Sequence, residues 1–125
     1  MPGLTTLKTY TSGDYSWLLN TSGFDEATTG FGKVASFTKA THFPDGYLPC
    51  GLMLNVANEK DVKPYTGAAG EVLGFSMKDV PVTEGQADGI GFAFIIRGQI
   101  RTANLPVKDN LPATAPAGFY FAKGA

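Results

Sequence analysis

Ile90-Gly91-Phe92-Ala93-Phe94-Ile95-Ile96-Arg97 is the stretch that decides the fold. It is apolar on both faces until its end, which predicts a strand buried in the middle of a sheet. Its apolar core, residues 92–96, is the longest uninterrupted apolar run in the chain. A membrane-spanning helix needs about 20 such residues. The sequence therefore predicts a sheet-forming protein with no membrane partner.

The rest of the chain supports β structure. Among 125 residues there are 16 glycines and 8 prolines, and both residue types are unfavourable inside helices. Pro64 confines its strand to a sheet edge. We expect an all-β protein with little helix, a small β-barrel or sandwich, with residues 34–125 as one domain. The further strands are expected around residues 34–38, 52–56, 62–65, 71–77, 80–82, 98–102 and 118–122.

Residues 1–33 form a region of different composition. Small polar residues dominate it, and neither a helical nor a strand period holds for more than a few positions. Disordered segments are normally poor in aromatic residues, so this aromatic-containing segment is expected to be a loose extended N-terminal arm that orders against a partner. The expected contacts are its apolar side chains: Leu4, Leu7, Tyr10, Tyr15, Trp17, Leu18 and Leu19. The alternative is that residues 17–19 cover the chain's own core.

Charge excludes some partners. Ten basic and eleven acidic residues give a net charge of −1, with no basic cluster. Nucleic acids and acidic membrane surfaces attract such clusters, so neither is expected as a partner. The single cysteine, Cys50, allows no intrachain disulfide, which fits folding in a reducing cytosol.

The sequence contains few candidate catalytic or metal-ligating residues. His42 and Cys50 could form a nucleophile–base pair, but a lone cysteine beside a strand is more often a small buried apolar residue. A closed zinc site needs four ligands, and these are the only His and Cys residues. We therefore expect no enzyme activity, no catalytic residue, no metal and no cofactor.

Three stretches of residues 48–106 carry a resemblance to a known family. The first is Leu48-Pro49-Cys50-Gly51-Leu52-Met53-Leu54. The second is Val62-Lys63-Pro64-Tyr65, followed by a Gly-containing turn and Val72-Leu73-Gly74-Phe75. The third is Ile96-Arg97-Gly98-Gln99-Ile100-Arg101 with Leu105-Pro106 after it. In their order and spacing they resemble the lambda-type head decoration (capsid cement) proteins of tailed bacteriophages.

The resemblance implies a virion protein made in the bacterial cytoplasm. It would form a homotrimer, bind the major capsid protein on the outer surface of the expanded capsid and stabilise the shell, with its N-terminal segment ordering there. Two other interpretations stay open. One is a carbohydrate- or peptide-binding β-sandwich with Tyr15, Trp17 and Tyr47 as a stacking surface, and the other is a tail or neck component of a virion.

Overall fold

The structure, a computed structural model, describes residues 15–19 and 27–122. The elements in chain order are β1 (Thr28–Lys33), η2 (Val34–Ser36), α2 (Lys39–His42), β2 (Tyr47–Leu48), β3 (Met53–Asn55), β4 (Lys63–Pro64), β5 (Leu73–Ser76), β6 (Val80–Pro81), β7 (Gly89–Ile95), β8 (Gly98–Arg101), η3 (Thr102–Asn104) and β9 (Phe119–Ala122). No helix in these ranges is long and apolar enough to span a membrane. The predicted all-β class is confirmed.

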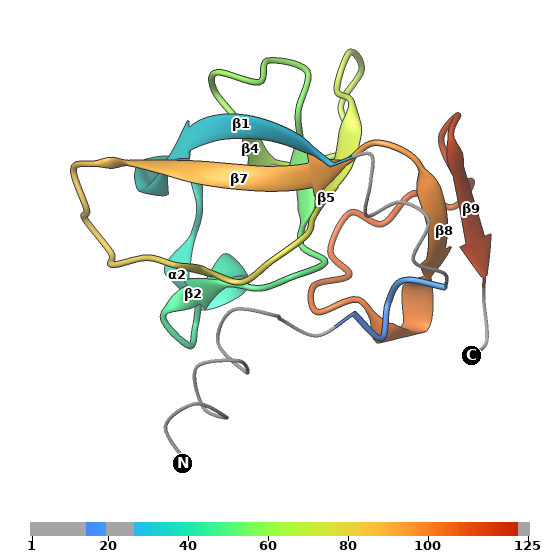
Figure 1. The fold of residues 1–125 in the computed structure, drawn as a ribbon, viewed down its shortest axis with the longest axis horizontal. Coiled ribbons are helices and arrows are strands. Elements are labelled where there is room, and N and C mark those ends of the chain that lie inside the picture. Colours follow the sequence, from blue (N-terminus) through green and yellow to red (C-terminus); the bar gives the residue numbers. More distant parts are fainter. Residues whose placement is uncertain (1–14, 20–26, 123–125) are drawn as a thin grey trace.

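Five antiparallel strands form the main sheet in the order β1-β7-β5-β3-β4. β7 lies between β1 and β5 (Figure 1), so the prediction of a central strand at this point is confirmed. β4 lies at the end of the sheet order, where Pro64, which lacks a backbone N–H, is tolerated.

The sheet curls until β1 approaches the segment that precedes β4. The Phe31 N–H donates to the Glu59 carbonyl oxygen and the Val62 N–H donates to the Phe31 carbonyl oxygen, both at 2.8 Å. Gly32 forms a parallel bridge with Val62. A Cβ at Gly32 would lie 2.5 Å from the Val62 carbonyl oxygen, so this approach requires glycine. The result is a half-barrel.

The interior of the half-barrel forms the first core. Ile90, Phe92 and Phe94 alternate along β7 toward this interior, as the two-residue period of a strand dictates. The two-stranded sheet of β2 and β6 adds Leu48 and Val80. The other buried members are Val34, Phe37, Phe43, Leu52, Leu54, Val56, Val62 and Val82.

A second core lies between the half-barrel and a small sheet of parallel strands β8 and β9, which stand beside it in Figure 1. Met53 of β3 and Phe75 of β5 face this second core, whereas Leu54 faces the first. Strand β3 is therefore covered on both faces. The buried members of the second core are Trp17, Cys50, Met53, Leu73, Phe75, Met77, Ile95, Ile100, Leu105 and Phe121.

Two sequence predictions about the extent of the strands are wrong. Residues 28–33 are not part of an arm, because they pair along their whole length with β7 as strand β1. The domain therefore begins before residue 34. Residues 34–38 are not a strand: residues 34–36 form a 3-10 turn, which places Val34 and Phe37 on one side where both are buried.

Candidate functional site

Residues 15–19, which belong to the expected arm, are fixed to the small sheet. Leu18 bridges Ile100 of β8 in antiparallel register. The Leu19 N–H donates to the Gln99 carbonyl oxygen at 2.8 Å, and the Arg101 N–H donates to the Trp17 carbonyl oxygen at 2.6 Å. β8 is therefore hydrogen-bonded on both sides, by β9 and by this segment.

Trp17 belongs to the core. Its side chain is 1% exposed and stacks on Phe75, with ring centroids 5.6 Å apart. The expectation that Trp17 is a surface contact is therefore wrong, and the alternative that it covers the chain's own core is correct. The stacking surface of Tyr15, Trp17 and Tyr47 also fails, because the Trp17 ring is buried against the protein itself.

Tyr15, Leu18 and Leu19 are half-buried and pack beside Trp17 or pair with β8. The Tyr15 hydroxyl donates to the Met77 carbonyl oxygen at 2.5 Å. Burial, and then the neighbouring Cys50 and Asp79, raise the pKa of Tyr15, so the hydroxyl keeps its proton at neutral pH. Leu4, Leu7 and Tyr10 lie outside the described residues.

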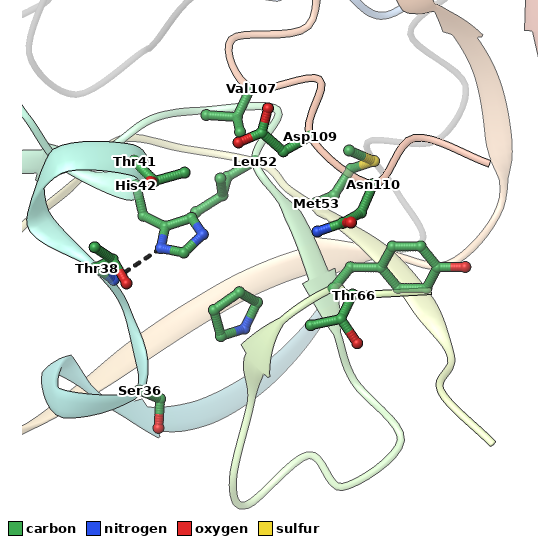
Figure 2. Close-up of a pocket in the computed structure, with 12 residues that line it drawn as sticks. Ser36, Thr38, Thr41, His42, Leu52, Met53, Thr66, Val107, Asp109 and Asn110 are labelled. Carbon is green, nitrogen blue, oxygen red and sulfur yellow. Dashed lines mark hydrogen bonds between the residues drawn. The ribbon is translucent and has the colours of Figure 1, made fainter. Parts of the chain in front are cut away.

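A pocket of about 330 Å³ lies between α2, strands β3 and β4, and the loop that follows η3 (Figure 2). Helix α2 is a single turn that begins after Thr38 and brings His42 to the pocket. The Thr38 N–H donates to His42 Nδ1 at 2.8 Å, and this bond fixes the ring. The pocket wall is completed by Ser36, Thr38, Thr41, Leu52, Met53, Pro64, Tyr65, Thr66, Val107, Asp109 and Asn110.

Asp109 and Asn110 enter the pocket from a turn in residues 108–111. The Leu111 N–H donates to the Lys108 carbonyl oxygen at 3.2 Å. Asn110 has φ +67°, a left-handed conformation that asparagine tolerates better than most residues. Sequence reasoning missed both residues as site residues. The Asp-Asn pair between two prolines is a turn signal, but it does not show which surface the turn faces.

His42 and Cys50 line different cavities. Cys50 lies in the second core, with its backbone N–H bonded to Asp79 Oδ1 at 2.8 Å, and it lines a smaller cavity with Trp17 and Asp79. Within residues 15–19 and 27–122, no three His, Cys, Asp or Glu side chains are placed to hold a metal ion.

Burial lowers the pKa of His42 below its usual 6.5, and the nearby Asp109 carboxylate opposes this shift without cancelling it. The unfolded chain therefore binds the His42 proton more readily than the folded chain does. This contribution to stability is complete above pH 6.5 and is lost as the pH falls through the lowered pKa. Protonation at Nδ1 would also break the bond from Thr38.

We expect the free energy of unfolding of the wild type to fall more steeply than that of His42→Gln between about pH 7.5 and about pH 5. Glutamine does not titrate, so the difference between the two slopes isolates His42. Urea unfolding followed by circular dichroism at several pH values measures both slopes. Equal slopes would show that His42 is not the group that titrates.

Exposed aromatic side chains mark two other parts of the surface. Phe31 of β1 is 62% exposed and Tyr120 of β9 is 60% exposed. Phe31 lies opposite Gly91 of β7 on the outer face of the half-barrel. Aromatic residues are enriched at protein–protein interfaces, so both positions are candidates for contact with another chain.

Comparisons with family models, with curated proteins and with solved structures find no match to this chain.

Proposed function

We propose that this chain is a structural protein of a tailed bacteriophage particle, which binds the outer surface of the expanded capsid as a homotrimer and stabilises the shell. Its partners are the major capsid protein and its own copies. The resemblance supports this proposal. The stretches that carry it lie on β3, on β4, on β5 and on the connection from β7 into β8.

The observation that carries the proposal is the attachment of residues 15–19 to β8. The bonds of Leu18, Leu19 and Tyr15 fix residues 15–19, to which residues 1–14 are joined in the chain. Residues 1–14 contain Leu4, Leu7 and Tyr10, spaced among threonines. A segment of this composition suits strand addition to a sheet edge, where backbone bonds hold it and alternate side chains select the partner.

A trimer would present three copies of a weak contact to the shell. Three segments tethered at fixed points raise each other's effective concentration on the shell, so modest single contacts give tight overall binding. A protein that binds the assembled shell in preference to free subunits stabilises the shell by mass action. Because the net charge is −1, apolar contacts and hydrogen bonds would dominate, and added salt would weaken binding only modestly.

Deletion of residues 1–14 tests the proposal and leaves Trp17 and all strands of the half-barrel in the chain. We expect the truncated chain to keep its circular dichroism spectrum and unfolding midpoint, and to lose at least about tenfold in affinity for expanded capsids of the same virus. Cosedimentation with capsids measures this, and light scattering reports the oligomeric state.

The matched control is the full-length chain with Thr5→Ser and Thr6→Ser, which keeps Leu4, Leu7 and Tyr10. It should decorate capsids like the wild type. If the truncated chain decorates capsids at full occupancy, residues 1–14 do not contact the capsid. If the full-length chain does not bind capsids, the proposed function is wrong.

A further inference from the structure

The pocket beside His42 has the size of a small-molecule site. Its volume is about 330 Å³, and ligand pockets start at about 300 Å³. Three separate parts of the chain meet there, namely the turn of α2, strands β3 and β4, and residues 107–110. The pocket has room for a ligand of about one ring.

The polar groups around the pocket are positioned by the backbone. Because His42 Nδ1 accepts the Thr38 N–H, the proton of the neutral ring is on Nε2, which is a donor. Figure 2 shows this second ring nitrogen directed into the pocket, toward the side from which Asn110 enters. The Asn110 amide offers a donor and an acceptor, and the Asp109 carboxylate is an acceptor.

The charge of the pocket excludes anionic ligands. Among the described residues that line it, Asp109 is the only carboxylate, and none is Lys or Arg. A phosphate or carboxylate ligand would find no fixed positive charge, since burial disfavours the charged form of His42. The hydroxyls of Ser36, Thr38 and Thr41 instead can both donate and accept, as the hydroxyls of a ligand do, whereas the Thr66 hydroxyl donates to Glu71 Oε2 at 2.6 Å and can only accept.

The remaining wall is apolar. Leu52, Met53, Pro64 and Val107 offer aliphatic surface, and Tyr65 adds an aromatic ring. A ring compound with hydroxyls at its edge and C–H groups on its faces matches both kinds of wall. A pyranose has this chemistry, and it carries no charge when unmodified.

We propose that the pocket between α2 and residues 107–110 binds one neutral monosaccharide unit, with hydrogen bonds to His42 Nε2, Asp109 and Asn110. This binding is independent of capsid decoration. The unit can be a free sugar or the end of a glycan, and the two sources share the same recognition chemistry.

The test is a titration of the full-length chain, followed by amide chemical shifts. The probes are glucose, galactose, mannose and N-acetylglucosamine, each also as its methyl glycosides, with glucuronate as the anion and methylamine as the cation. We expect at least one neutral sugar to shift amides in residues 38–42, 64–66 and 107–110 with a dissociation constant of about 1–10 mM. Binding of the methyl glycoside would assign the end of a glycan, and binding of the reducing sugar alone would assign a free sugar.

Asp109→Asn removes the charged acceptor and should lower the affinity for the sugar at least about fivefold, since hydrogen bonds to a charged group are stronger than those to a neutral group. Asp88→Asn makes the same change at an exposed residue that does not line the pocket, and should bind like the wild type. Absence of sugar-induced shifts at the pocket, stronger shifts from methylamine or glucuronate, or equal sugar affinity in Asp109→Asn would each overturn the proposal.

Discussion

Replacing Trp17 with alanine is expected to lower the free energy of unfolding by about 3–5 kcal/mol. The side chain is among the largest that are fully buried, and it lies in the second core between Phe75 and the β8–β9 sheet. It also covers Gly51, where an added Cβ would lie 2.7 Å from the indole nitrogen. Alanine would leave a cavity that the hydrogen-bonded strands around it can only partly fill.

Two further variants serve as comparisons for Trp17→Ala. Trp17→Phe is expected to cost less than Trp17→Ala, because it keeps a ring, leaves a smaller cavity and removes an indole N–H that has no partner among the described residues. Tyr120→Ala, which removes an exposed aromatic side chain, should stay within about 0.5 kcal/mol of the wild type.

Urea unfolding is best followed by circular dichroism, because Trp17 is the only tryptophan and its fluorescence disappears with the mutation. If Trp17→Ala is no more destabilising than Tyr120→Ala, the side chain is not part of the core. Residues 15–19 would then be available for contacts with another protein.

Local pattern was enough to predict the strands that an apolar run, a proline or an aromatic cluster marks. The apolar run of β7 predicts a central strand, and β7 lies between β1 and β5 in the sheet. Pro64 predicts an edge because a missing N–H is harmless only there. Phe119–Ala122, an aromatic cluster after a proline-rich tail, forms β9 as expected. These features depend on the residue and its immediate neighbours.

Strand β1 could not be predicted in this way. Thr28–Lys33 contains two glycines and two threonines, a composition that is typical of a loop. It is a strand because Gly30 and Gly32 are the buried positions, where the side chains of Phe92, Phe94 and Val62 take the space that other residues would need. That fit involves Val62, about thirty positions away, and β7, about sixty positions away, so no local pattern reports it.

The pocket beside His42 could not be predicted from the sequence either. The sequence offers Cys50 as a candidate nucleophile for His42, whereas the structure pairs the His42 ring with the backbone of Thr38 and places Asp109 and Asn110 near it. The turn of α2 is too short for a helical period to reveal it. The tail residues reach the pocket from a loop that follows η3, and Leu105 of this loop is buried in the second core.

The second large effect on stability is expected where β1 approaches Val62 and closes the half-barrel. Gly32→Ala is expected to lower the free energy of unfolding by about 2–4 kcal/mol, because the new methyl group overpacks the contact and the hydrogen bonds beside it weaken. The Cβ would lie 2.5 Å from the Val62 carbonyl oxygen and 3.1 Å from the Phe92 ring. The carbonyl belongs to the backbone, so it can move away only if the segment before β4 separates from β1.

Gly91→Ala is the matched control, since Gly91 lies on β7, the strand that pairs with β1, but on its outward face. Its Cβ would meet nothing closer than the Phe31 ring at 4.0 Å. We expect a change within about 0.5 kcal/mol, and it can be stabilising because alanine restricts the unfolded chain. Hydrogen exchange at the amides of Phe31 and Val62, which donate across the closure, should accelerate in Gly32→Ala and not in Gly91→Ala. Equal effects of the two substitutions would mean that the approach of β1 to Val62 contributes nothing to stability, and the sheet would then be held by its β1–β7 pairing alone.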